Sequence, residues 1–227
     1  PMVSPDGQQL LFTRSNQSSD TFNQLLVMNL SDQQTQTITN QDAIYKSPHW
    51  SQNQDYWYYI RCIKSSCEFV QQHIENLRSK TLFQLPEHSY KFSLSPTKQQ
   101  IALNYQNGQT PGITLIDFEA ASVSMQKVPV TAFSPANQIA SSPKYDLSGE
   151  GVFYVSRKNG IASKLYYYHI ASESNRLISQ DFHSILAIEN KSDTELWVAA
   201  KYDGQFAIWL LDLETQSRQM ITQNFTG

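Results

Sequence analysis

Two cysteines, Cys62 and Cys67, carry the most specific chemical signal in this chain. They flank the stretch 63–66, which joins two runs that are predicted to be strands. In a hairpin of this length the two Cα atoms face each other across the loop, as a disulfide requires. The spacing therefore favours a disulfide, and with it an oxidising compartment, over two free cytosolic thiols.

The same cysteine pair fits other chemistry poorly. A C-x4-C spacing has no second pair in this sequence, and His73 alone does not complete the four ligands of a zinc site. A redox-active pair more usually has the spacing C-x-x-C. The sequence therefore predicts neither a metal nor a cofactor.

Catalysis needs a nucleophile, a base and a group that orients the base. The chain is rich in Ser and Asp, but none of them stands in a recognisable catalytic string, and the G-x-S-x-G elbow of serine hydrolases does not occur. The five histidines are interpreted as turn or strand residues: His49, His73, His88, His169 and His183. We therefore expect a protein that is not an enzyme.

A turn followed by an apolar strand is the unit that repeats along the chain. Its clearest copy is Ser4-Pro5-Asp6-Gly7, in which Pro fixes φ, Asp can bond its own backbone and Gly accepts a positive φ. Partial copies are Trp50-Ser51, Ser95-Pro96 and Ser148-Gly149, and a degraded one lies near Asn190. The copies are roughly 42 to 53 residues apart, which is typical of propeller repeats.

Each unit contains about four short apolar runs, as expected of a four-stranded blade. A single blade cannot bury both faces, so the core is expected to lie between neighbouring blades, where the aromatic runs 56–59 and 166–168 would pack. The predicted fold is an all-β propeller with about five repeats in one domain, residues 1–227. The predicted units are 1–40, 41–86, 87–130, 131–180 and 181–227.

Three details of the units are less regular. The first unit is expected to lack its leading strand, because the chain starts inside a repeat. The third unit is expected to close at 124–128, and the leading strand of the fourth is expected near 138–140. Either a parent protein supplies further blades to a larger propeller, or the two ends of the chain share one blade.

These repeats resemble the WD40-like repeats of the TolB family. The resemblance rests on Ser4-Pro5-Asp6-Gly7, on the aspartates that end second strands, Asp117 and Asp212, and on the closing pairs Ile38-Thr39 and Ile221-Thr222. It covers nearly the whole chain and implies a β-propeller. It says little about activity, because propellers serve as enzymes, scaffolds and sensors.

Charge and hydropathy exclude two kinds of direct partner. The 17 basic and 20 acidic residues nearly balance, and no basic run is long enough to follow a phosphate backbone, so direct contact with nucleic acid is not expected. No apolar run approaches the ~18 residues of a membrane span. Membrane attachment is therefore expected only through a span outside this segment.

With its cysteine hairpin and Gln-rich turns, the chain also resembles the C-terminal domains of CadC/ToxR-like transcriptional regulators. That resemblance implies a sensor on the periplasmic side of the bacterial inner membrane, joined by one helix to a cytoplasmic winged-helix domain. A protein partner or a small-molecule signal would bias its conformation or the formation of a homodimer. Two alternatives are a TolB-like periplasmic scaffold for envelope proteins and the propeller domain of a serine peptidase.

Overall fold

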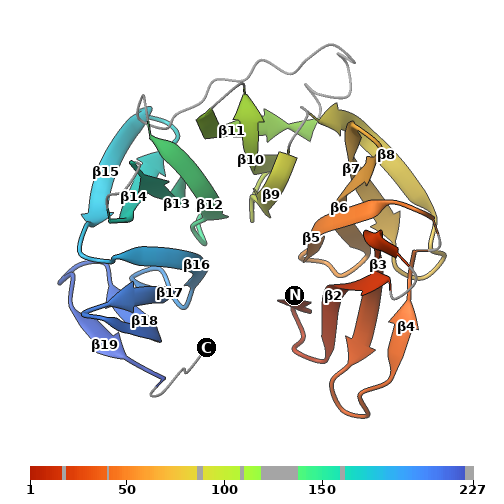
Figure 1. Ribbon diagram of the computed structural model, residues 1–227, viewed down its shortest axis with the longest axis horizontal. Coiled ribbons are helices and arrows are strands. Elements are labelled where there is room, and N and C mark those ends of the chain that lie inside the picture. Colours follow the sequence, from red (N-terminus) through yellow and green to blue (C-terminus); the bar gives the residue numbers. More distant parts are fainter. Residues whose placement is uncertain are drawn as a thin grey trace. The chain divides into compact units, whose positions relative to one another are not determined.

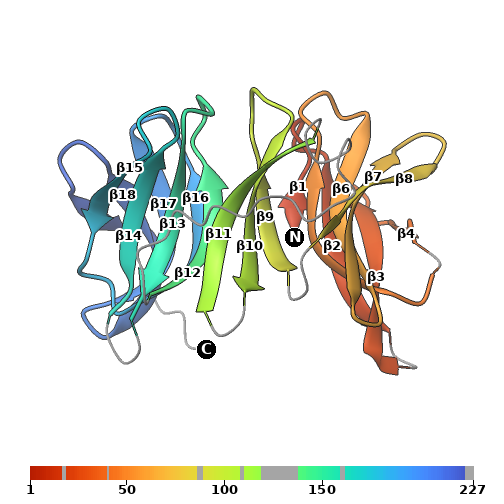
Figure 2. The ribbon, with the colours of Figure 1, turned by 90° about the horizontal axis from the view of Figure 1, so that it is seen from above.

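The structure is a computed structural model that describes residues 1–16, 19–39, 41–85, 89–107, 110–118, 138–158 and 162–222. In these ranges the secondary-structure elements are all β-strands, which confirms the predicted all-β class. Strands that follow each other in sequence are also neighbours in the sheets. Figures 1 and 2 show the strands of each sheet running alongside one another.

The strands form five consecutive sheets, which we call blades 1 to 5. Blade 1 consists of β1 (Met2–Val3), β2 (Gln9–Asn16), β3 (Ser19–Asn29) and β4 (Thr35–Thr37). Blade 2 consists of β5 (Ile44–Trp50), β6 (Tyr56–Ile63), β7 (Ser66–His73) and β8 (Ser79–Leu85). The described strands of blade 3 are β9 (Ser89–Leu94), β10 (Gln100–Asn107) and β11 (Thr110–Asp117).

Blade 4 consists of β12 (Ile139–Tyr145), β13 (Gly151–Arg157), β14 (Lys164–His169) and β15 (Ser174–Ser179). Blade 5 consists of β16 (Ser184–Asn190), β17 (Glu195–Tyr202), β18 (Gln205–Asp212) and β19 (Arg218–Met220). Neighbouring strands in blades 1, 2, 4 and 5 pair antiparallel.

The expectation that the first unit lacks a leading strand was wrong. Met2 and Val3 pair with Leu11 and Leu10 of β2, which makes a short first strand. The predicted leading strand of the fourth unit is present as β12, and the predicted closing strand of the third unit, 124–128, lies outside the described residues. The five unit boundaries and the single-domain organisation stay predictions.

The described residues form two compact units, and the division falls inside β9. The first unit holds blades 1 and 2 with residues 89–91 and 117–118. The second holds residues 92–107 and 110–116 with blades 4 and 5. Each unit has its own core between neighbouring blades, as the repeat pattern predicts.

The core of the first unit lies between blades 1 and 2. Leu11 and Leu25 of blade 1 and Trp57 and Tyr59 of blade 2 belong to one buried cluster. The Asn23 side chain joins the blades by accepting a hydrogen bond from the Tyr45 amide (2.6 Å) and donating one to the Tyr45 carbonyl (2.8 Å). One amide side chain thus reproduces the two bonds of a β-bridge between the blades.

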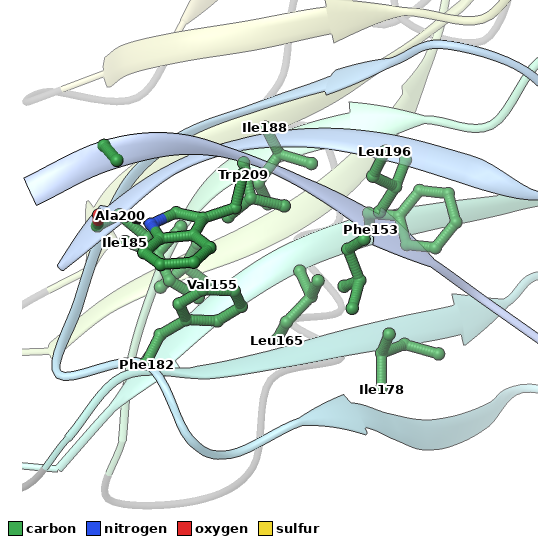
Figure 3. Close-up of a cluster of buried hydrophobic side chains, with 13 residues drawn as sticks. Phe153, Val155, Leu165, Ile178, Phe182, Ile185, Ile188, Leu196, Ala200 and Trp209 are labelled. Carbon is green, nitrogen blue, oxygen red and sulfur yellow. Dashed lines mark hydrogen bonds between the residues drawn. The ribbon is translucent and has the colours of Figure 1, made fainter. Parts of the chain in front are cut away.

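In the second unit an apolar cluster fills the space between blades 4 and 5 (Figure 3). Leu165, Leu196 and Phe182 are fully buried there. A side-chain hydrogen bond also joins blades 3 and 4, because the Asn104 amide donates to the Ala140 carbonyl (2.8 Å). Within each unit, the layer between neighbouring blades holds the strands in place.

Candidate functional site

The clearest repeat turn is built by its own side chains. The Gly7 amide donates to the Ser4 carbonyl (2.9 Å), with Pro5 and Asp6 between them, and Gly7 has φ +74°. The Ser4 hydroxyl donates to Asp6 Oδ1 and accepts from the Gln9 amide (2.9 Å). The Ser4 hydrogen bond, followed by one from the Gln8 amide, lowers the pKa of Asp6. These residues form a turn, and their polar groups are used within it.

The partial copies repeat this bonding with other residues. Ser51 exchanges hydrogen bonds with the Tyr56 backbone: its amide donates to the Tyr56 carbonyl (2.8 Å) and its hydroxyl accepts from the Tyr56 amide (2.9 Å). In blade 3 the Ser95 amide donates to the Gln100 carbonyl (2.9 Å), and Pro96 follows it in the turn. Trp50 lies in the core between blades 1 and 2. The turns at Ser51 and Ser95 therefore shape the backbone.

In blade 4 the alignment of Ser148 with Ser4 was wrong by two residues. The Asp146 amide donates to the Gly151 carbonyl (3.1 Å) and the Gly149 amide donates to the Asp146 carbonyl (3.3 Å), so Asp146 takes the place of Ser4. The Ser148 hydroxyl donates to Asp146 Oδ2 (3.0 Å), as Ser4 does to Asp6 with the two residue types exchanged. The alignment was wrong because Ser and Asp can both accept hydrogen bonds from backbone N–H groups in turns, so either residue can take this place.

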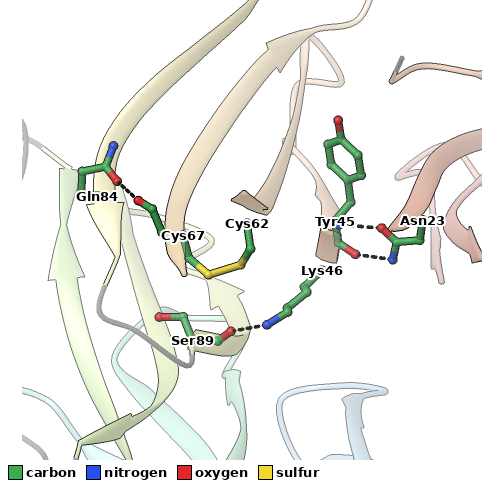
Figure 4. The surroundings of a disulfide bond; sticks show 8 residues. Asn23, Tyr45, Lys46, Cys62, Cys67, Gln84 and Ser89 are labelled. Carbon is green, nitrogen blue, oxygen red and sulfur yellow. Dashed lines mark hydrogen bonds between the residues drawn. A yellow bond between two sulfur atoms is a disulfide. The ribbon is translucent and has the colours of Figure 1, made fainter. Parts of the chain in front are cut away.

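The predicted disulfide is confirmed. Cys62 and Cys67 are directly opposite each other on β6 and β7, with the two sulfurs 2.04 Å apart and the Cα atoms 4.1 Å apart. Both side chains are buried, and Figure 4 shows their surroundings. Nearby, the Lys46 ammonium donates to the Ser89 carbonyl (3.2 Å), and burial lowers the pKa of Lys46. The disulfide cross-links the β6–β7 hairpin next to its turn, and strand pairing holds the other positions of the hairpin.

Three histidines are hydrogen-bonded through Nδ1 to residues two or three positions away in the sequence. The partners are Ser47 for His49, Glu75 for His73 and Ser172 for His169. The His183 amide donates to the Lys201 carbonyl (2.8 Å), and His88 lies outside the described residues. Within the described ranges, no group of three or more His, Cys, Asp or Glu side chains is placed to hold a metal ion. No helix in the same ranges is long and apolar enough to span a membrane.

A cleft of about 670 Å³ lies within the first unit, where the chain that links blades 1 and 2 passes the second blade. Thr37, at the end of β4, and Thr39 and Gln41 of the link line one side of it. Tyr45, Tyr59, Arg61 and Gln72 line it from blade 2. We call this the interblade cleft. Among the described residues that line it, none belongs to a turn motif or is a cysteine or histidine singled out from the sequence.

Arg61 is the charged residue among the described lining residues of the cleft. Its Nη2 lies 3.1 Å from Glu68 Oε2, with only 18% and 17% of the two side chains exposed. Nη2 also donates to Thr81 Oγ1 (3.3 Å), Nη1 donates to Gln41 Oε1 (3.3 Å), and Nε is buried without a partner in the part of the chain that the structure describes. The guanidinium is thus held in place but its hydrogen-bonding capacity is incompletely used.

Two tyrosines and one glutamine complete the polar wall. The Tyr59 hydroxyl donates to Gln72 Oε1 (2.9 Å), and the Gln72 amide donates to the Ile38 and Leu77 carbonyls (3.2 and 3.1 Å). Burial raises the pKa of Tyr45 and Tyr59, so both phenols stay protonated at neutral pH. The polar side chains of this wall are thus hydrogen-bonded to one another and to the backbone beside the Arg61 guanidinium.

Sequence reasoning missed this site because Arg61 and Glu68 look like outward-facing strand residues. The signal that would have found them is a comparison of the second and fifth repeats. At the corresponding positions of the fifth repeat stand Ala200 and Ala207, so the charged pair replaces small residues in an apolar layer.

Comparisons with known proteins show the fold. No family model matches the chain, and no curated protein matches it. The structure is similar to TolB from Acinetobacter baumannii, with a TM-score of 0.79 and 14% identity over 95% of this chain and 53% of that one. A TolB-like structure from Agrobacterium tumefaciens gives a TM-score of 0.77 and 14% identity over 96% of this chain and 78% of that one.

A puromycin-hydrolysing peptidase from Mycobacterium tuberculosis is also similar, with a TM-score of 0.71 and 12% identity over 96% of this chain and 37% of that one. The chain thus spans about half of the Acinetobacter TolB and a smaller share of the peptidase. The fold is a TolB-like β-propeller. This class of fold is shared by scaffolds and by domains of peptidases, so the fold alone does not assign an activity.

Proposed function

We propose that the chain is a non-enzymatic sensing and interaction propeller on the periplasmic side of the bacterial inner membrane. The observation that carries the proposal is the buried Cys62–Cys67 disulfide, because such bonds form and persist in oxidising compartments. The TolB-like fold supports the same location. The partner is a protein or a small-molecule signal.

Binding fits the side chains better than catalysis does. The polar groups of the turn residues and of three histidines are hydrogen-bonded to the backbone or to side chains nearby in the sequence. His169 Nδ1 and the Ser172 hydroxyl are within hydrogen-bond reach of each other (2.8 Å), as a base and a nucleophile must be, but the pair is exposed in a turn and the Ser172 hydroxyl also contacts Ser174. A cleft lined by a partly buried arginine is suited to recognition.

The finer proposal is that the parent protein is a CadC/ToxR-like, single-pass regulator. A signal bound to this domain would bias its conformation or its assembly as a homodimer, and a cytoplasmic winged-helix domain would respond. The nearly balanced charge supports a role without direct nucleic-acid contact.

Two other functions have specific support. The similarity to TolB favours a periplasmic scaffold that binds envelope proteins. The similarity to the peptidase favours a propeller that belongs to a serine hydrolase. The sequence encoded upstream and downstream of the chain separates all three.

The test is to read that flanking sequence. A winged-helix pattern followed by one apolar span of about 20 residues supports the regulator. A cleavable signal peptide that leads into further blades makes the protein a scaffold and refutes the regulator. Roughly 250 further residues with a G-x-S-x-G elbow, about one α/β domain, make it a peptidase and refute the non-enzymatic role.

A further inference from the structure

We propose that the interblade cleft binds a small organic carboxylate with an apolar body, and that Arg61 recognises the carboxylate. The proposal deepens the sensing function and rests on it in one respect, because this ligand would be the signal. It is carried by a comparison of equivalent positions within the chain and by the geometry of Arg61.

Blades 2 and 5 provide the comparison. β6 pairs with β7, and β17 pairs with β18, through the same eight-position antiparallel register. Each position of one hairpin therefore has a counterpart in the other. The polar residues of blade 2 and their counterparts are Arg61 and Ala200, Glu68 and Ala207, and Gln72 and Leu211.

In blade 5 these counterparts are buried in the apolar cluster against blade 4, where Ala200 and Leu211 are fully covered. Blade 5 thus packs on blade 4 with small and apolar residues at these positions, whereas blade 4 has Ser156 and Lys164 at the place of Arg61 and Glu68. Replacing a buried ion pair by apolar residues is often neutral or stabilising, so the Arg61–Glu68 pair is not explained by stability. Blade 2 differs from both in having an ion pair at this position, with its arginine lining a cleft, and this combination points to recognition.

The cleft has the size of a ligand site. Its volume of about 670 Å³ lies within the roughly 300–1,000 Å³ of small-molecule pockets. Leu77, which is 40% exposed, and Ile38 supply apolar surface at the cleft. An aliphatic or aromatic body can pack there while a polar group reaches Arg61.

The hydrogen bonds of Arg61 indicate which polar group of a ligand it would bind. Its Nη1 is bonded to the neutral Gln41 side chain at 3.3 Å, which is long for a guanidinium bond, and Gln41 is exposed. A carboxylate forms shorter and stronger bonds with a guanidinium than an amide does, so it would displace Gln41. Glu68 holds the guanidinium through Nη2 and is not among the described lining residues of the cleft.

The test is titration of the 227-residue chain with N-acetyl-leucine, and with N-acetyl-leucinamide as the uncharged control, followed by calorimetry and by NMR of labelled protein. We expect saturable binding of the acid, with shifts at Tyr45, Tyr59, Arg61 and Gln72. The amide should bind at least about tenfold more weakly, because it lacks a hydrogen bond between charged groups.

Two variants separate recognition from a structural role. Glu68→Gln leaves the Arg61 charge uncompensated and should tighten binding of the acid by about tenfold, a change that a merely structural pair would not give. Arg61→Gln combined with Glu68→Gln keeps the shape, removes both charges and should abolish the preference for the acid. Arg176→Gln, at an exposed arginine of β15, is the matched control and should bind as the unmodified chain does.

Equal binding of acid and amide would overturn the proposal. So would the absence of binding at millimolar acid to both the unmodified chain and Glu68→Gln, with circular dichroism showing that each is folded. These results concern the cleft alone. The flanking sequence tests the proposed function separately, so either can fail without the other.

Discussion

Breaking the Cys62–Cys67 disulfide is expected to lower the free energy of unfolding by about 2 kcal/mol while the fold persists. The two cysteines are five residues apart in sequence, so the bond closes a short loop and removes only a modest amount of chain entropy from the unfolded state. In the native state the hairpin is also held by eight paired positions of β6 and β7. Removing the bond therefore weakens the blade without dissolving it.

The assay is urea unfolding of the oxidised chain, the reduced chain and the variant Cys62→Ala/Cys67→Ala. Tryptophan fluorescence reports on both cores, since Trp50 and Trp57 lie between blades 1 and 2 and Trp209 lies between blades 4 and 5. With a slope near 2 kcal/mol per molar urea, the midpoint should fall by about 1 M in the reduced chain and in the variant alike.

Reductant should have no effect on the variant, which is the internal control. The reasoning is refuted if reduction leaves the midpoint of the native sequence unchanged. It is equally refuted if reduction unfolds the chain without denaturant, because the bond would then hold far more of the structure than one hairpin.

Three further predictions use the same unfolding assay. Both Gly7 and Gly149 have positive φ, and Gly7→Ala should destabilise the chain by about 1 kcal/mol. Gly149→Ala should destabilise it by more, because only there would the new Cβ meet a neighbouring atom, Thr97 Oγ1, at 2.4 Å. Equal losses of stability would contradict this. Leu196→Ala should cost about 2–5 kcal/mol, since the side chain is fully buried, whereas the half-exposed Leu177 should tolerate Ala with a small loss. Because burial raises the pKa of Tyr59 above its ordinary value of 10.0, the unfolded state loses this proton first, so the contribution of Tyr59 to stability should be constant below pH 10 and fall as the pH rises above it. Tyr59→Phe should flatten that fall, and an unchanged slope would show that Tyr59 is not responsible.

The repeat turns could be predicted from the sequence because their chemistry is local. Ser4, Pro5, Asp6 and Gly7 contain every group that the turn uses apart from the amides that follow it. The same locality explains the error at Ser148, because Asp146 is an equally good acceptor two residues earlier. Short-range patterns locate a turn but do not always fix its register.

Features that depend on pairing between distant segments could not be predicted. β1 has only two residues, and it is a strand because β2 lies beside it. Arg61 lies in an otherwise apolar strand and reads as a solvated position. Its role becomes visible only when the register with β7 and the approach of the link at Gln41 are known.

The periplasmic location is tested most directly by the redox state of the two cysteines in living cells. Cells that express the parent protein are quenched in acid, denatured without reductant and treated with a maleimide, and the peptides that carry Cys62 and Cys67 are read by mass spectrometry. We predict that neither cysteine is labelled until reductant is added. Labelling of both without reductant would place the chain in a reducing compartment and contradict the account.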